Sequence, residues 1–181
     1  MNLVDTLEAL ADLNSEGLAF LLAFGVTWVI CGVLWRRIPS RHAALATLIQ
    51  GMVGLPLALG LSYAIGAFGA DRPVDPLIDE LSILIAVSQM LGLPLAIYLY
   101  ATERYLLVPF AWASVVSMHF VLYSWLYRTP LYIVMSVVIS LGCVIVMAVA
   151  ERRSSVTDRT ASTICLLTGS ALLVTGLALQ I

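Results

Sequence analysis

This sequence contains no lysine and few charged residues of either sign. Of its 181 residues, 11% are charged and 61% are hydrophobic. An average soluble domain has about 25% charged and about 45–50% apolar residues. A soluble domain of this length needs more polar surface than these side chains provide, so we expect lipid to surround most of the chain. Nine arginines against eleven acidic residues leave a net charge of −2, and a nucleic-acid partner is therefore not expected.

The sequence also lacks the residue spacing of a disulfide framework or a metal site. Three cysteines, Cys31, Cys143 and Cys165, lie singly inside apolar runs, where we interpret them as small packing residues. We expect no bound metal and no cofactor, because no second ligand lies at metal-binding spacing within these runs. No catalytic residue is predicted, since a buried nucleophile with a partner and a buried carboxylate pair are both missing.

Long apolar runs are what the sequence does contain. Six occur, at residues 17–35, 43–69, 82–101, 105–127, 131–150 and 161–181. A helix of about 20 residues crosses a hydrocarbon core of about 30 Å. Backbone amides in lipid must be bonded within their own segment, and the alternation of barrel strands is absent. The predicted fold is therefore all-α, a polytopic six-helix transmembrane bundle that forms one domain over residues 17–181.

Residues 1–16 precede the first run and form a separate N-terminal segment. Its leucines recur at helical spacing opposite its acidic residues, as in an amphipathic helix that lies on a membrane surface. A frayed polar lead-in is the alternative. The leucines are Leu3, Leu7 and Leu10, and the acidic residues are Asp5, Glu8 and Asp12.

The arginines predict the orientation in the membrane. Because cytoplasmic loops are enriched in arginine and lysine, the side with seven arginines should be inside and both termini outside. Arginine and alanine without lysine are typical of a GC-rich bacterial genome, so we expect a multi-pass protein of the bacterial inner (plasma) membrane. The predicted inner connections hold Arg36, Arg37, Arg41, Arg104, Arg152, Arg153 and Arg159, and the outer side holds Arg72 and Arg128.

Small residues follow Gln50 at every fourth position of the second run. Such a stripe lets another helix approach closely where lipid offers no hydrophobic drive for association. It fits an internal packing seam, and it also fits a contact between copies of the chain or a pore-lining face. The residues are Gly54, Ala58, Ser62, Gly66 and Ala70.

The second and third runs share the sequence Gly-Leu-Pro-Leu-Ala, which contains Pro56 in one and Pro94 in the other. A proline inside a helix removes one backbone hydrogen bond, so both helices are predicted to be kinked. Matched interruptions in opposed segments are typical of transporter sites, but ordinary kinks relieved by neighbouring helices have the same pattern. Asp75 followed by Pro76 further predicts an N-cap that starts the third helix.

His119 is the one ionisable side chain well inside a run whose charge can change near neutral pH. Counting about 1.5 Å per residue from the ends of the runs places four other polar side chains at its depth, roughly 10 Å below the outer surface. Two further aromatic residues share its helix face. The depth-matched residues are Ser88, Gln89, Ser62 and Tyr63, and the face-sharing residues are Trp112 and Tyr123.

Polar groups within a bilayer normally face the bundle interior or a water-filled cavity. We therefore predict that these seven residues form a ligand-binding site. The alternative is a structural role, in which a neutral His119 is bonded to Gln89 or Tyr123 and joins the third helix to the fourth.

A set of motifs in this region resembles a family of small bacterial membrane proteins of unknown function. The motifs are Asp75-Pro76-Leu77, Ser88-Gln89, Pro109, His119-Phe120, Tyr123-Ser124-Trp125-Leu126-Tyr127 and Tyr132. The chain departs from the family pattern at Asp75 and Ser88, where asparagine is expected, and at Leu122-Tyr123, where a Pro-Phe pair is expected. The resemblance implies a polytopic membrane protein and no particular activity.

Two function hypotheses follow. The first is a small-solute or ion transport or channel protein, in which His119 and Gln89 lie in a polar pocket reached from outside and activity changes between about pH 5 and 8. The second is a non-catalytic scaffold that binds other membrane proteins, or copies of itself, through the small-residue stripe. An intramembrane enzyme acting on lipid ranks third.

Overall fold

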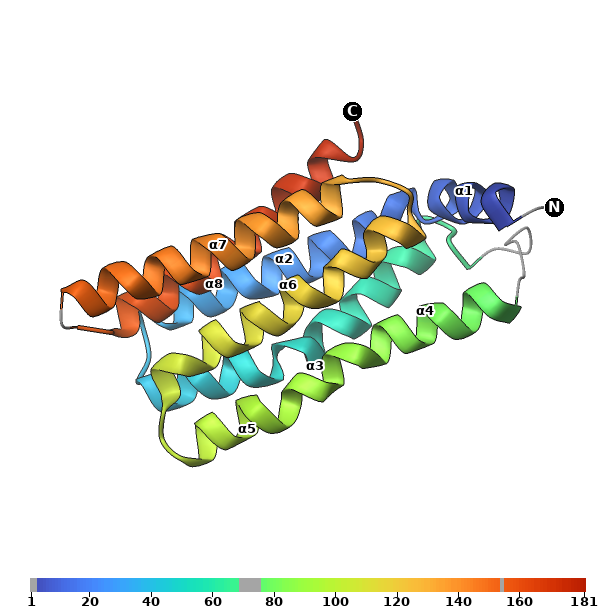
Figure 1. Cartoon of the computed structure of the whole chain (residues 1–181). Helices are drawn as coiled ribbons and strands as arrows, with labels where there is room; N and C mark the ends of the chain where they lie inside the picture. The colour runs from blue at the N-terminus through green and yellow to red at the C-terminus, as the bar shows by residue number, and fades with distance from the viewer. Residues whose placement is uncertain (1–2, 69–75, 154) are drawn as a thin grey trace.

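The computed structural model describes residues 3–68, 76–153 and 155–181, and these ranges contain helices and no strand. Six helical segments in this part of the chain are long and apolar enough to cross a membrane, and they pack side by side as a bundle (Figure 1). The prediction of an all-helical fold with six segments able to span a membrane is confirmed for the described residues. The segments are Ser15–Leu34, Ser40–Ala64, Pro76–Ala101, Tyr105–Leu126, Leu131–Arg152 and Asp158–Ala178.

The bundle has two distinct ends. The chain begins and finishes at one of them, which we call the N-terminal end (Figure 1). The connections that carry most of the arginines lie at the opposite, arginine-rich end. The α-helices are α1 (Leu3–Leu13), α2 (Leu18–Leu34), α3 (Ser40–Ala64), α4 (Pro76–Ser88), α5 (Leu93–Ala101), α6 (Val108–Leu126), α7 (Leu131–Arg152) and α8 (Asp158–Ala178).

Helices α2 and α8 approach to backbone contact. A Cβ atom added at Gly169 of α8 would lie 2.8 Å from the carbonyl oxygen of Gly25 and 2.8 Å from the backbone nitrogen of Val29. Gly32 lies seven residues after Gly25 on α2, and Gly176 lies seven residues after Gly169 on α8; both also face the partner helix. Small residues at such intervals allow two helices to pack closely in lipid, and this pair forms the centre of the bundle.

Helix α3 packs on α2 through the predicted stripe. Gln50 accepts a hydrogen bond from the hydroxyl of Thr27 over 2.6 Å, inside the bundle. A Cβ atom added at Gly54 would lie 3.2 Å from the ring of Phe24. Ala58 is fully buried. From Gln50 to Ala58 the stripe is therefore an internal packing seam, and little of it is free for a contact between copies of the chain.

The prediction that Gly66 belongs to this stripe is wrong. Helix α3 ends at Ala64, and a Cβ atom added at Gly66 would meet nothing within 4 Å. Gly66 has φ +79°, and the amide of Ala67 donates to the carbonyl oxygen of Ser62 over 3.0 Å. Gly66 is thus the left-handed residue that ends the helix, a role in which glycine has no steric cost. Ala70 and Asp75 lie outside the described residues.

The third span is interrupted and the second is not. α3 continues as one α-helix through Pro56. The third span consists of α4, a 3-10 turn over Gln89–Gly92, and α5, which has Pro94 in its first turn. The interruption therefore lies just before Pro94. A bend at either proline stays a prediction.

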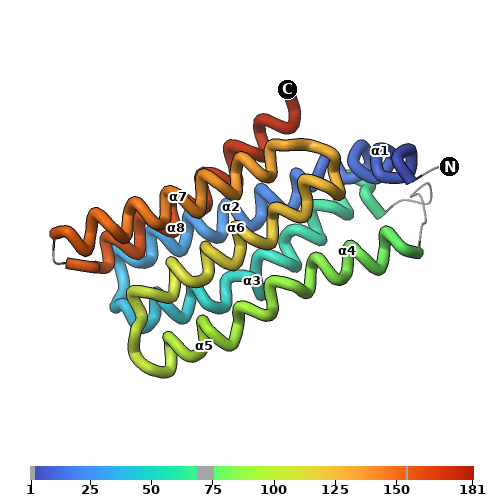
Figure 2. The backbone as a smooth tube through the Cα atoms, in the orientation of Figure 1, coloured from blue at the N-terminus to red at the C-terminus, as the bar shows by residue number. Residues whose placement is uncertain are grey.

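The interrupted span, α4 and α5, lies at the edge of the bundle (Figure 2). Only 11% of the residues in its most apolar stretch are buried, against 50% in the spans of α2 and α8. Its main contacts are with α6, where Gly92 packs against Val115. This span is the most weakly attached part of the described bundle.

Residues 3–13 form the amphipathic helix that was one of the two interpretations of the N-terminal segment. Leu7 and Leu10 of α1 are buried in a small apolar cluster with Ile78 of α4 and Leu126 of α6. The acidic residues Asp5, Glu8 and Asp12 are exposed. α1 thus lies against the N-terminal end of the bundle and covers the place where α4 meets α6.

Candidate histidine site

His119 lies inside the bundle, on the face of α6 that meets α4. Its side chain is 7% exposed, and its Nδ1 lies 3.1 Å from the hydroxyl oxygen of Ser88. The Ser88 hydroxyl donates its proton to the carbonyl oxygen of Ile85 over 2.6 Å. With the serine proton on this carbonyl, the serine oxygen accepts from a protonated Nδ1 and Nε2 of the neutral ring carries the lone pair; in the other tautomer the hydroxyl donates to Nδ1.

Ser88, and not Gln89 or Tyr123, is the hydrogen-bonding partner of His119. Gln89 begins the 3-10 turn and is half-buried, and within the described ranges its side chain makes no hydrogen bond. Successive helical residues point about 100° apart, so only one of the two neighbours can face α6. The depth argument placed the correct segment of α4 beside His119 but did not distinguish these adjacent residues.

An aromatic cluster surrounds the histidine. The ring of His119 meets those of Phe120 and Tyr123 edge to face, at centroid distances of 5.4 Å and 5.1 Å. Tyr123 in turn packs on Tyr127 and Tyr132, at 5.8 Å in each case. We call these five rings the aromatic cluster. Phe120 and Tyr123 contact the imidazole directly, and Tyr127 and Tyr132 extend the cluster from Tyr123.

Sequence reasoning did not place three members of this cluster in the site. Phe120 and Tyr127 could have been predicted as members of the site, because residues 116, 120 and 123 of α6 and residue 127, its C-cap, follow the helical repeat of one face. Tyr132 could not, since it enters from the first turn of α7. Its side chain is 1% exposed, and its hydroxyl donates to the carbonyl oxygen of Glu16 over 2.5 Å.

Two predicted members do not join the site. Ser62 is buried on α3 and Tyr63 is 78% exposed, and no hydrogen bond connects either side chain to His119 in the described part of the chain. Depth alone brought them into the prediction, but their helix packs chiefly on α2 while α4 packs on α6. Equal depth is therefore a weaker signal than a shared helix contact.

Trp112, also predicted, lies about two helical turns before His119 on α6 and is 4% exposed. Its indole nitrogen has no hydrogen-bond partner among the described protein atoms, and the same holds for Trp28 Nε1 and Ser136 Oγ. A buried donor without a partner costs free energy and commonly marks the place of a water molecule or a ligand. The interior of the bundle therefore contains polar groups that could each bind a water molecule or a polar ligand.

The chain matches the model of a family described as "Family of unknown function (DUF7010)" over residues 5–176. No curated protein and no solved structure matches the chain. The matched range includes the first five spans, all but the last two residues of the sixth, and the whole histidine site, in agreement with the uncharacterised family suggested by the motifs.

Proposed function

Because this chain belongs to DUF7010, a family whose function is unknown, we propose its role from the geometry of the histidine site: transport of a small solute or ion across the bacterial inner membrane. In this proposal the arginine-rich end faces the cytoplasm and both termini lie outside, as the distribution of arginine favours. The described arrangement is then a closed state of the transporter.

The observation that carries the proposal is the hydrogen bond between His119 and Ser88. An ionisable side chain within a bilayer is costly and is usually retained for function. Here it is bonded to the last residue of α4, directly before the 3-10 turn over Gln89–Gly92. Interrupted helices are where transporters commonly expose polar groups to a solute.

Opening of the site requires α4 to move away from α6. The His119 ring is 7% exposed and is bonded to Ser88 of α4, so a solute can reach this ring only after the α4–α6 interface separates. The α4–α5 span is the least buried one, which makes its displacement less costly than that of any central helix. Gln89, next to Ser88, would become available as a second polar ligand.

Proton and potassium flux through the purified protein in liposomes tests this proposal. We expect wild-type protein to carry one of these ions at a rate that depends on pH, and His119→Ala to lower that rate at least about tenfold. His42→Ala is the matched control, because His42 lies in the first turn of α3 at the arginine-rich end. Unchanged flux in His119→Ala would contradict the proposal, and a pH-independent rate would remove a proton-coupled role for the imidazole.

A further inference from the structure

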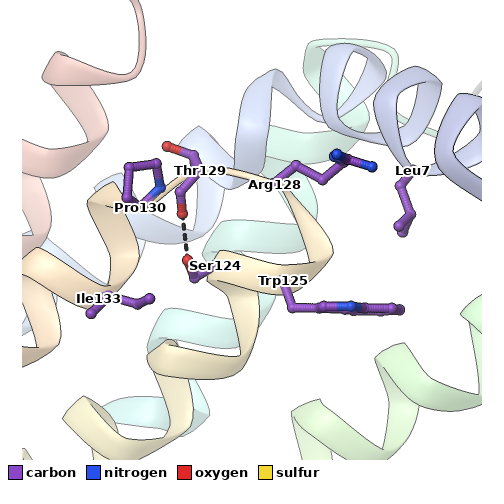
Figure 3. A pocket seen from close by; sticks show the side chains of 7 residues that line it. All are labelled: Leu7, Ser124, Trp125, Arg128, Thr129, Pro130 and Ile133. Atoms are coloured by element: carbon purple, nitrogen blue, oxygen red, sulfur yellow. Dashed lines mark hydrogen bonds between the residues drawn. The ribbon is translucent and has the colours of Figure 1, made fainter.

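A groove at the N-terminal end lies outside the histidine site. It has a volume of about 430 Å³ and is formed by the turn between α6 and α7 together with one side chain of α1 (Figure 3). Figure 3 shows the guanidinium of Arg128 extending toward Leu7, with the flat ring of Trp125 below it. The lining residues are Leu7, Ser124, Trp125, Arg128, Thr129, Pro130 and Ile133. We propose that this groove binds the phosphate group of a membrane glycerophospholipid through Arg128.

The backbone conformation of Arg128 is the first argument. Helix α6 ends with the amide of Thr129 donating to the carbonyl oxygen of Ser124 over 3.2 Å, and Arg128 has φ +53°. The end of α3 has the same bonding pattern, with Gly66 in the left-handed position. Arginine is strained in this conformation and glycine is not. Strain of this kind is often retained at binding sites; because Glu103 after α5 has the same conformation, with φ +60°, the strain supports the proposal together with the charge of Arg128 and the lining of the groove.

The charge of Arg128 is the second argument. The residue is exposed, and no ion pair to its guanidinium occurs within the described ranges. A guanidinium presents a planar pair of N–H donors that matches two oxygens of a phosphate. The side chain of Thr129 lies on the opposite side of the groove, next to Pro130 (Figure 3), so the phosphate contact rests on Arg128.

The apolar walls of the groove favour a lipid over a free phosphate ion. Trp125 is 49% exposed, and tryptophan is enriched where a bilayer meets water. Ile133 continues into a line of exposed apolar side chains along α7, at Val137 and Leu141. A lipid whose phosphate contacts Arg128 can therefore lay an acyl chain along α7.

Binding to purified protein in mild detergent tests the proposal, measured by calorimetry with three probes. These are dioctanoyl phosphatidylglycerol, dioctanoylglycerol without the phosphate, and inorganic phosphate. We expect the wild type to bind the phospholipid at least tenfold more tightly than either other probe. Equal binding of dioctanoylglycerol would show that the phosphate contributes nothing, and equal binding of inorganic phosphate would identify an ion site and not a lipid site. Either result overturns the proposal.

Variants at position 128 separate binding from folding. Arg128→Gly relieves the strained turn, so we expect its midpoint of thermal unfolding to rise by about 2–4 °C while its affinity for the phospholipid falls at least tenfold. Arg128→Lys should retain most of the affinity, and Arg153→Gln at the opposite end should retain all of it. Wild-type affinity in a folded Arg128→Gly variant would overturn the proposal. The histidine site is not altered in any of these variants, so the result is independent of the transport proposal.

Discussion

The α2–α8 pair and the α4–α5 span are both apolar, yet they are held in the bundle in different ways. Half of each central helix is buried and their backbones touch at Gly25 and Gly169, whereas α4 and α5 are mostly exposed and touch α6 through side chains. Lipid gives helices no hydrophobic reason to associate, so close backbone packing decides which ones are firmly attached. The difference shows that apolarity predicts insertion into the membrane, while small residues predict attachment within the bundle.

The largest effect is expected from Gly169→Leu. Backbone atoms of α2 already lie 2.8 Å from the position of a Cβ at residue 169, so a leucine there would force α2 and α8 apart. Overpacking of this kind costs about 3 kcal/mol or more when the backbone must move. We expect loss of the folded protein in a thermal unfolding measurement in detergent.

Gly60→Leu is the matched control for this substitution, because a Cβ atom there meets nothing within 4 Å. It should unfold close to the wild-type temperature. A folded Gly169→Leu variant of normal stability would show that the backbone contact between α2 and α8 does not hold the bundle together.

A smaller effect is expected from Gly92→Ala in the peripheral span. The new methyl group would lie 2.5 Å from a methyl carbon of Val115, so α4 and α5 must shift or the valine must change its rotamer, at a cost of about 1–3 kcal/mol. Hydrogen exchange should become faster in residues 76–101 and stay unchanged in α2 and α8. Uniform acceleration over all the spans would mean that the peripheral span unfolds together with the centre.

The smallest effect is expected from Ser88→Ala. Hydrogen bonds between membrane helices contribute about 0.6 kcal/mol on average, so global stability should hardly change. A cysteine substituted for Ile85, which is 4% exposed, should nevertheless react faster with a maleimide when Ser88→Ala is also present. Labelling at the same rate with and without Ser88 would indicate that this hydrogen bond does not hold α4 on α6.

The fold was largely predictable because the length of each apolar run is set by the thickness of the bilayer. The stripe on α3 was also predictable from Gln50 to Ala58, but the seven-residue spacing of Gly25 with Gly32 and of Gly169 with Gly176 was overlooked, although it marks the closer crossing. The two glycine pairs lie at opposite ends of the chain, and their spacing predicts a contact only once it is known that α2 packs on α8.

The histidine site was predictable in part. Depth along the helices correctly brought α4 and α6 together at His119, because helical rise fixes depth. Rotation about each helix axis is set by packing, and this is why Ser88 was not separated from Gln89 and why Tyr63 was wrongly included. Tyr132 was present in the family motifs, but its hydrogen bond to Glu16 joins residues more than 100 positions apart, and no local pattern indicates that contact.

The hydrogen bond from Tyr132 to Glu16 connects the first span to the fifth at the edge of the aromatic cluster. Gly17 also depends on it sterically, since a Cβ atom at that position would lie 2.7 Å from the tyrosine oxygen. An extension or fusion joined before α1 leaves this junction intact, whereas a truncation that removes Glu16 deprives the tyrosine of its acceptor. Expression of this protein for further study should therefore retain its first sixteen residues and carry any affinity tag ahead of them.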